Sequence, residues 1–268
     1  AGEKSVKLGL GETLITRKVT DLDIIVKTCT SVQLVSQTKK RIFEKEKSEY
    51  TYRTIKSLVR SVKQLKENFK NLNVKFVIFD VNSPEHDKKK ILSIINDEGF
   101  KAELHSVEIE KEVQDNMLST MSSIKSSFNY AKKSKDLIYF VEDDYIHKIE
   151  SLTEMLFAYE KFSSIFKREI FIVPSDYPYL YKNMSNTNIL IGENIHWRTV
   201  NESLLTFLTS RKMIEKYFDK LINMATVKSD PFEKNLHEIY ENEKCFSPIP
   251  SLSIHCTNVN SVFGLSPN

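Results

Sequence analysis

Short apolar runs alternate with amphipathic stretches along the first two-thirds of the chain. The runs are rich in Val, Ile and Phe and end in polar residues, so we predict buried strands at residues 23–28, 74–80, 102–109 and 137–141. Between and after the strands, apolar positions recur with helical spacing, which predicts helices at residues 55–69, 84–95, 113–133 and 150–166. This alternation predicts an α/β fold with a largely parallel, doubly wound central sheet flanked by helices.

The second half of the chain has a less regular pattern. Strands are expected at residues 169–174, 188–197 and 204–209, the last two as neighbours, and a helix at 211–224. Asp230 and Pro231 suit the start of a short helix that runs to about Tyr240, and an extended run follows at 246–255. We expect one domain, 1–268, in which a nucleotide-binding half (21–148) is closed by a second half (149–268).

Three acids, Glu142, Asp143 and Asp144, directly follow the apolar run at 137–141. Three like charges at the end of a buried strand repel one another and resist leaving water. Hard cations such as Mg²⁺ and Mn²⁺ take oxygen ligands and often bridge to phosphates, and ligands of open α/β sheets sit at the carboxyl ends of strands. The residues alone leave two interpretations open: a cation site, or a solvated acidic turn that caps the next helix.

Polar side chains also follow the first two predicted strands. Thr28 and Thr30 lie where the first strand ends, and Asp80 with Asn82 lie where the second ends. Small hydroxyl-bearing residues suit a loop at a ligand site, but this stretch alone favours a plain turn. His255 lies in the last extended run, where a hydrogen-bonded structural histidine is the alternative to a metal ligand.

Composition narrows the class of protein. An apolar share of 40% and a charged share of 28% are typical of a soluble globular protein, and a net charge of +3 is too small to indicate nucleic acid as a partner. The three cysteines show no metal-binding spacing, which favours reduced thiols in a cytoplasmic protein. No apolar run is long enough for a membrane helix and no signal-peptide core is present, which leaves peripheral contact with a membrane open.

The order and spacing of these motifs, from about Asp21 to His255, resemble those of GT-A fold nucleotide-sugar glycosyltransferases. The opening strand and Asp80 resemble family 2 of these enzymes, and Glu-Asp-Asp resembles the variant of the DXD metal motif in N-acetylglucosaminyltransferase I. The resemblance implies a Rossmann-like GT-A fold that uses Mn²⁺ or Mg²⁺ and takes a nucleotide-sugar donor, UDP by class frequency, and a glycan or other hydroxyl acceptor.

The same resemblance assigns roles to single residues. It implies that Asp80 contacts the uracil or ribose of the donor, with Thr28, Thr30 and Asn82 in the donor site. Asp144 becomes the first metal ligand and His255 completes the metal shell. Glu142 would bind the metal through water or reach the ribose, and Asp143 would face the donor sugar.

An inverting transfer also needs a carboxylate that accepts the proton of the acceptor hydroxyl. Asp230 is the first candidate and Glu233 the second, since inverting members carry this acid at the start of a helix. Simple N-capping of that helix is the alternative for Asp230. In the acceptor site we expect Trp197, while Tyr177, Tyr179 and Tyr181 suit either sugar stacking or packing between the two halves.

Two other functions remain open. A sugar-nucleotide nucleotidyltransferase shares the fold but usually carries a Gly-rich loop after the first strand, and the chain has no glycine between Thr28 and Gly99. A catalytically inactive nucleotide- or sugar-binding protein of the same fold is the non-enzymatic alternative. The charged stretches at 39–41 and 45–47 indicate a solvated connector.

Overall fold

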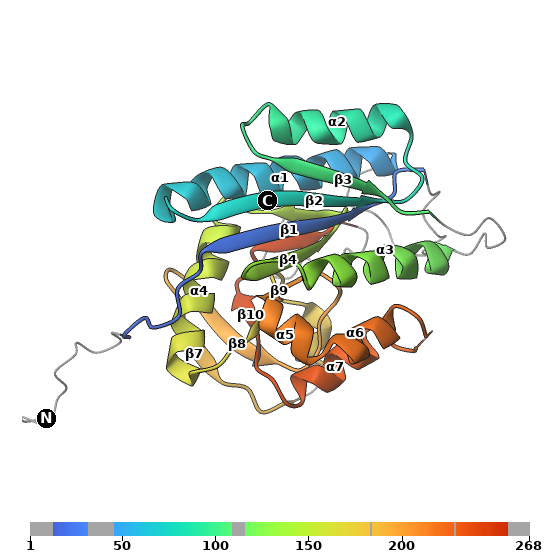
Figure 1. Ribbon diagram of the computed structural model, residues 1–268. Coiled ribbons are helices and arrows are strands. Elements are labelled where there is room, and N and C mark those ends of the chain that lie inside the picture. Colours follow the sequence, from blue (N-terminus) through green and yellow to red (C-terminus); the bar gives the residue numbers. More distant parts are fainter. Residues whose placement is uncertain (1–12, 32–45, 109–115, 183, 228, 257–268) are drawn as a thin grey trace, which may run out of the picture.

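The computed structural model describes residues 13–31, 46–108, 116–182, 184–227 and 229–256. A long sheet runs through the molecule, and helices cover both of its faces (Figure 1). The strands of this sheet are β1 (Asp21–Thr28), β2 (Asn73–Asp80), β3 (Ala102–Ser106), β4 (Leu137–Glu142), β6 (Phe171–Ile172), β7 (Ile189–Ile191), β8 (His196–Val200), β9 (Phe207–Ser210) and β10 (Cys245–Ile249). A separate two-stranded sheet consists of β5 (Tyr145–His147) and β11 (Ser253–His255).

The strand order of the large sheet is β3-β2-β1-β4-β9-β6-β10-β8-β7. The first four strands are parallel, and β10 is parallel to β6. Strand β9 is antiparallel to both β4 and β6, and β8 is antiparallel to both β10 and β7. All strands except β8 and β9 therefore run in one direction. The carboxyl ends of β1, β2 and β4 meet at the same edge of the sheet, which is where the predicted site residues lie.

The helices form one layer on each face of the sheet. Apolar residues of α1 (Lys47–Asn68), α2 (Glu85–Asn96) and α4 (Ser151–Phe166) pack on one face in a single hydrophobic cluster. The other face is covered by α3 (Asn116–Ala131), α5 (Arg211–Lys216), α6 (Phe218–Met224) and α7 (Lys234–Tyr240), whose apolar residues form a second cluster. The predicted α/β class, with a sheet flanked by helices, is confirmed.

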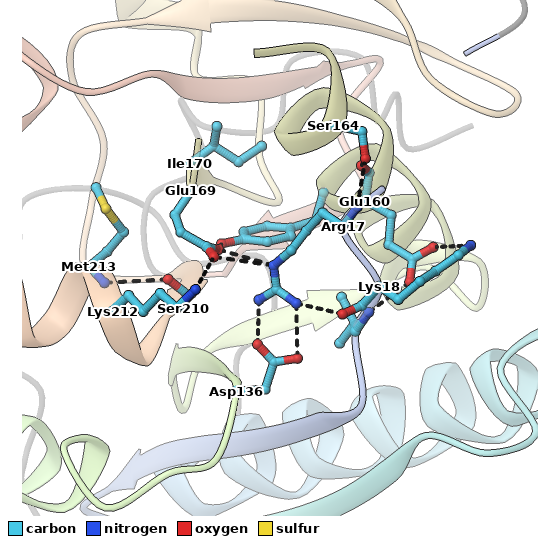
Figure 2. A network of polar contacts seen from close by, with 12 residues as sticks. Arg17, Lys18, Asp136, Glu160, Ser164, Glu169, Ile170, Ser210, Lys212 and Met213 are labelled. Atoms are coloured by element: carbon cyan, nitrogen blue, oxygen red, sulfur yellow. Dashed lines mark hydrogen bonds and ion pairs between the residues drawn. The ribbon is translucent and has the colours of Figure 1, made fainter. Parts of the chain in front are cut away.

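A polar network fastens the segment before β1 to the rest of the fold (Figure 2). The guanidinium of Arg17 donates hydrogen bonds to Glu169 at 3.2 Å and to both carboxylate oxygens of Asp136, the residue before β4. It also lies 5.7 Å from the centre of the Tyr159 ring in α4. One side chain thus joins the segment before β1 to the residues that precede β4 and β6 and to α4.

Several expected elements differ from those observed. The short strand β5 was not predicted, and residues 188–197 form parts of two strands, β7 and β8, joined by a turn. The expected neighbour relation between 188–197 and 204–209 is wrong, because β9 lies between β4 and β6. The helix expected at 211–224 is broken at Tyr217, whose φ of −111° is not helical. The last helix begins at Lys234 and not at Asp230.

Candidate active site

The ends of β1 and β2 are joined by side-chain hydrogen bonds. Thr28 and Asp80 are partners in the parallel register, and the Thr28 hydroxyl donates to the Asp80 carboxylate at 2.7 Å. The other carboxylate oxygen accepts from the Ser83 backbone N–H at 3.1 Å, a contact that the left-handed turn at Asn82 (φ 55°) makes possible. Asp80 is fully buried, whereas Asn82 is exposed. These contacts give the end of β2 one defined conformation.

The loop after β1 is attached to the same turn. The backbone N–H of Thr30 donates to the Ser83 hydroxyl at 2.9 Å, and its own hydroxyl donates to Asp87 of α2 at 2.5 Å. The structure therefore brings together Thr28, Thr30 and Asp80, three of the residues expected in a donor site, on one continuous hydrogen-bonded network.

The three acids after β4 point in three directions. Side chains alternate between the faces of a strand, and Glu142 lies on the α3 side, two residues after Phe140 of the α3-side core. Asp143 points to α1: it accepts hydrogen bonds from the Thr51 hydroxyl at 2.9 Å and from the Cys29 backbone N–H at 3.1 Å. Asp144 points to β11, where its carboxylate lies 3.1 Å from Nε2 of His255.

Cationic side chains of the protein neutralise two of these acids. Lys47, at the start of α1, forms a buried ion pair with Asp143, and their side chains are 11% and 10% exposed. The pKa of Lys47 is raised because Asp143 and Asp144 outweigh the opposing effect of burial. Burial lowers the pKa of His255, but the interaction with Asp144 outweighs this effect and raises it. Asp144 therefore favours the imidazolium form of His255.

A third cation lies beside Glu142. Lys27 of β1 is the register partner of Glu142 and lies on the same side of the sheet, two residues after Ile25 of the α3-side core. Burial lowers the pKa of Lys27, while Glu142 and Asp143 act in the opposite direction. The acids at the end of β4 are therefore compensated on both faces of the sheet by lysines.

Glu233, the second candidate for the base, lies beside this group. It forms the N-cap of α7 and is half-buried. Burial, and then the negative charge of Glu142, raise the pKa of Glu233 to about 7, while Lys27 and His255 act in the opposite direction. A carboxyl with this pKa can accept and release a proton near neutral pH. Asp230, the first candidate, is exposed and three residues away.

The donor set for a metal is incomplete. Asp144 and His255 together offer oxygen and nitrogen ligands that suit Mn²⁺, and both are largely buried. Within the described ranges, however, no three His, Cys, Asp or Glu side chains are grouped closely enough to hold an ion. Asp143 already accepts a hydrogen bond from Thr51 and pairs with Lys47, both of α1. Glu142 is therefore the remaining acid of the triplet that could bind an ion together with Asp144 and His255.

Two of the residues expected in the acceptor site, Trp197 and Tyr177, are buried, and a third, Tyr179, is half-buried. Trp197 is fully buried and packs edge-on against Phe162, so its prediction as an acceptor-pocket residue is wrong. Tyr177 is also buried, with its hydroxyl 2.9 Å from that of Tyr145. Tyr179 is half-buried, and its pKa is raised by burial and then by Glu202 and Glu233, which indicates that its hydroxyl lies in the environment of Glu233.

Lys27 and Lys47 were not recognised in the sequence as site residues. Lys47 was assigned to a solvated connector, which is wrong for this residue, because it begins α1 and points inward; residues 39–41 and 45 lie outside the described residues. A signal existed for Lys27, since a lysine that interrupts an apolar strand next to its end needs anionic neighbours.

Comparisons with known proteins gave structural likenesses only. No family model and no curated protein matches the chain. It is similar to the galactosyltransferase LgtC in complex with donor and acceptor sugar analogs (9% identity, 83% of this chain and 70% of that chain, TM-score 0.40). It is also similar to a proposed glucose-1-phosphate thymidylyltransferase from Bacillus anthracis (10% identity, 90% of this chain and 92% of that chain, TM-score 0.47). A third similar structure is the inositol-1-phosphate CTP transferase from T. maritima (13% identity, 90% of this chain and 91% of that chain, TM-score 0.37). Such values say nothing about the chemistry of the site.

Proposed function

We propose that the protein transfers a sugar from a nucleoside diphosphate sugar to an acceptor hydroxyl, with inversion at the sugar carbon. The observation that supports this function is the convergence of three strand ends, the Asp144–His255 pair and Glu233 at one edge of the sheet. Ligands of open α/β sheets bind at this edge.

Glu233 acts as the base in this proposal. Its carboxylate takes the proton of the acceptor hydroxyl while the hydroxyl oxygen bonds to the anomeric carbon. The bond between that carbon and the phosphate oxygen breaks, and its electron pair leaves with the diphosphate. A base with a pKa of about 7 suits this step better than exposed Asp230 does.

The remaining residues position the donor. Thr30 and Asn82 provide polar groups for the nucleobase and ribose of the donor. Buried Asp80, bonded to the Thr28 hydroxyl and the Ser83 backbone, holds the strand ends that carry these groups. Asp144 and His255, with Glu142, would hold Mn²⁺ or Mg²⁺, which when bound offsets the negative charge on the leaving diphosphate. Asp143, held by Lys47 and Thr51, keeps the end of β4 against α1.

Nucleotide binding and base function can be tested separately. We expect UDP with Mn²⁺ to raise the Tm of the wild-type protein and to have no such effect on Asp144→Ala. Glu233→Gln should bind UDP normally and lose about 100-fold or more of transfer activity, whereas Asp230→Asn should stay active. Stabilisation by a nucleoside triphosphate alone would favour a nucleotidyltransferase, and no effect of any nucleotide would contradict the proposed donor site.

A further inference from the structure

A groove of about 550 Å³ lies between α1 and β5, outside the candidate active site. Three cations, Arg53, Lys56 and Arg60, line one side of it. Spacings of three and four residues place these side chains on one face of α1, about a helical turn apart. This face points away from the core, since the apolar residues between them are buried against the sheet.

Most of this positive charge is uncompensated by described residues. Glu49 is the single acid that lines the groove, and its carboxylate pairs with Arg53 at 2.7 Å. Lys56 and Arg60 are exposed, and neither forms an ion pair with a side chain in the described ranges. Three cations and one carboxylate leave the rim with a net charge of +2.

The floor of the groove is neutral and firmly held. The Ser57 hydroxyl donates to the Thr54 carbonyl at 2.8 Å and accepts the backbone N–H of His147 at 3.0 Å. Burial lowers the pKa of His147 to about 3, so its ring carries no charge at neutral pH. The floor therefore does not oppose an anion held by the rim.

The far edge of the groove is apolar. Ile149 is 56% exposed, beside half-buried Ile146. An exposed isoleucine beside three cations suits a ligand that combines a negative headgroup with an apolar body. A free anion would leave this edge in water, and a nucleic acid would gain little from an aliphatic side chain.

We propose that this groove seats the phosphate headgroup of an anionic lipid, so that the face formed by α1 and β5 docks on a bilayer. Lys56 and Arg60 contact the phosphate, and Ile149 enters the boundary between headgroups and acyl chains. The bilayer surface then lies beside the candidate active site, because Tyr145 of β5 stacks on His255 with ring centroids 4.6 Å apart. The proposal stands on the groove alone and does not depend on the transferase reaction.

Co-sedimentation with vesicles tests this surface. We expect the wild-type protein to sediment with phosphatidylcholine vesicles that contain phosphatidylglycerol, and not with phosphatidylcholine alone. The double variant Lys56→Gln/Arg60→Gln should partition about 30-fold more weakly, since each basic side chain near an anionic surface contributes about fivefold. Ile149→Ser should also weaken binding, with little change in its salt dependence, because the charge of the rim stays the same.

A matched control removes the same charge elsewhere. Lys101 and Lys133 are exposed and line a second groove, of about 610 Å³, beside the starts of β1 and β2 at the opposite end of the sheet. Lys101→Gln/Lys133→Gln should bind vesicles as the wild type does. Equal losses in both double variants would mean non-specific attraction and overturn the proposal. Failure of the wild-type protein to bind anionic vesicles would also overturn the proposal, even if inorganic phosphate or an acidic peptide raised its Tm.

Discussion

At the residue scale, the half-buried carboxyl of Glu233 stabilises the fold only while it is protonated. Its pKa is raised in the folded protein to about 7 from an ordinary value of 4.5, so the folded protein binds the proton more tightly than the unfolded chain does. The stabilising contribution is complete below about pH 4.5 and is lost as the pH rises through about 7.

Replacement of Glu233 by Gln should remove this pH dependence. We expect Glu233→Gln to match the wild type in stability at pH 4 and to exceed it by about 1–3 kcal/mol at pH 8, although the variant loses transfer activity. Denaturant unfolding at several pH values measures this difference. A variant that is less stable than the wild type at pH 8 would show that the ionised carboxylate is well accommodated.

Lys27 also affects the ionisation of Glu233, because its positive charge favours the ionised carboxylate. Lys27→Met should raise the pKa of Glu233, so the acid limb of the pH profile of kcat/KM moves to higher pH. Lys27→Arg keeps the charge and should leave the limb in place. If Lys27→Met lowers activity equally at every pH, the lysine has no part in setting the ionisation of Glu233.

At the element scale, the end of β4 and the turn that follows it direct three consecutive acids toward different partners, which explains how the acids are tolerated. Glu142 lies on the α3 side with Lys27, Asp143 faces α1 and Lys47, and Asp144 faces His255 of β11. A single cation does not have to neutralise all three acids. Protein side chains provide much of the compensation that the sequence pattern had suggested for a metal.

The turn between β7 and β8 requires a glycine because the Trp197 ring leaves no room for a side chain at residue 192. A Cβ atom at Gly192 would lie 2.5 Å from Nε1 of Trp197, which is fully buried. Gly192→Ala should therefore destabilise the protein by about 1–3 kcal/mol, because the indole cannot move in a packed core. Thermal unfolding measures this change. In a Trp197→Phe background the smaller ring should relieve the clash, and an equal loss in both backgrounds would point to the backbone.

At the scale of the whole molecule, Arg17 joins the segment before β1 to the end of the sheet and to α4 (Figure 2). Its side chain is 22% exposed, and those of Asp136 and Glu169 are 13% and 14% exposed. Such a network lies between an exposed ion pair, worth about 0–1 kcal/mol, and a buried one, whose disruption costs about 3–5 kcal/mol.

We therefore expect Arg17→Met to lower the free energy of unfolding by about 2 kcal/mol. Arg211→Met is the matched control: Arg211 forms an exposed pair with Glu215 at 3.6 Å, and its loss should cost less than about 0.5 kcal/mol. Urea unfolding of both variants tests the difference. Equal effects would mean that the network around Arg17 adds no more stability than a surface pair.

No helix in the described part of the chain has the length and apolar character needed to cross a bilayer.

Local patterns in the sequence determined the elements of the first half and the strand ends that carry polar residues. Period-two and helical spacing of apolar residues depend on neighbours in the chain, so β1, β2 and β4 and the helices between them were predictable. The acids at 142–144, Asp80 and Thr28 were recognised for the same reason.

Only the tertiary structure decided which charges meet. Lys47 and Asp143 are 96 residues apart, and Glu233 approaches Glu142 and Lys27 only because α7 packs on the α3 side of the sheet. The insertion of β9 between β4 and β6 and the burial of Trp197 also follow from long-range packing. Spacing along a chain carries no information about such contacts, because they depend on how distant elements cover each other's apolar faces.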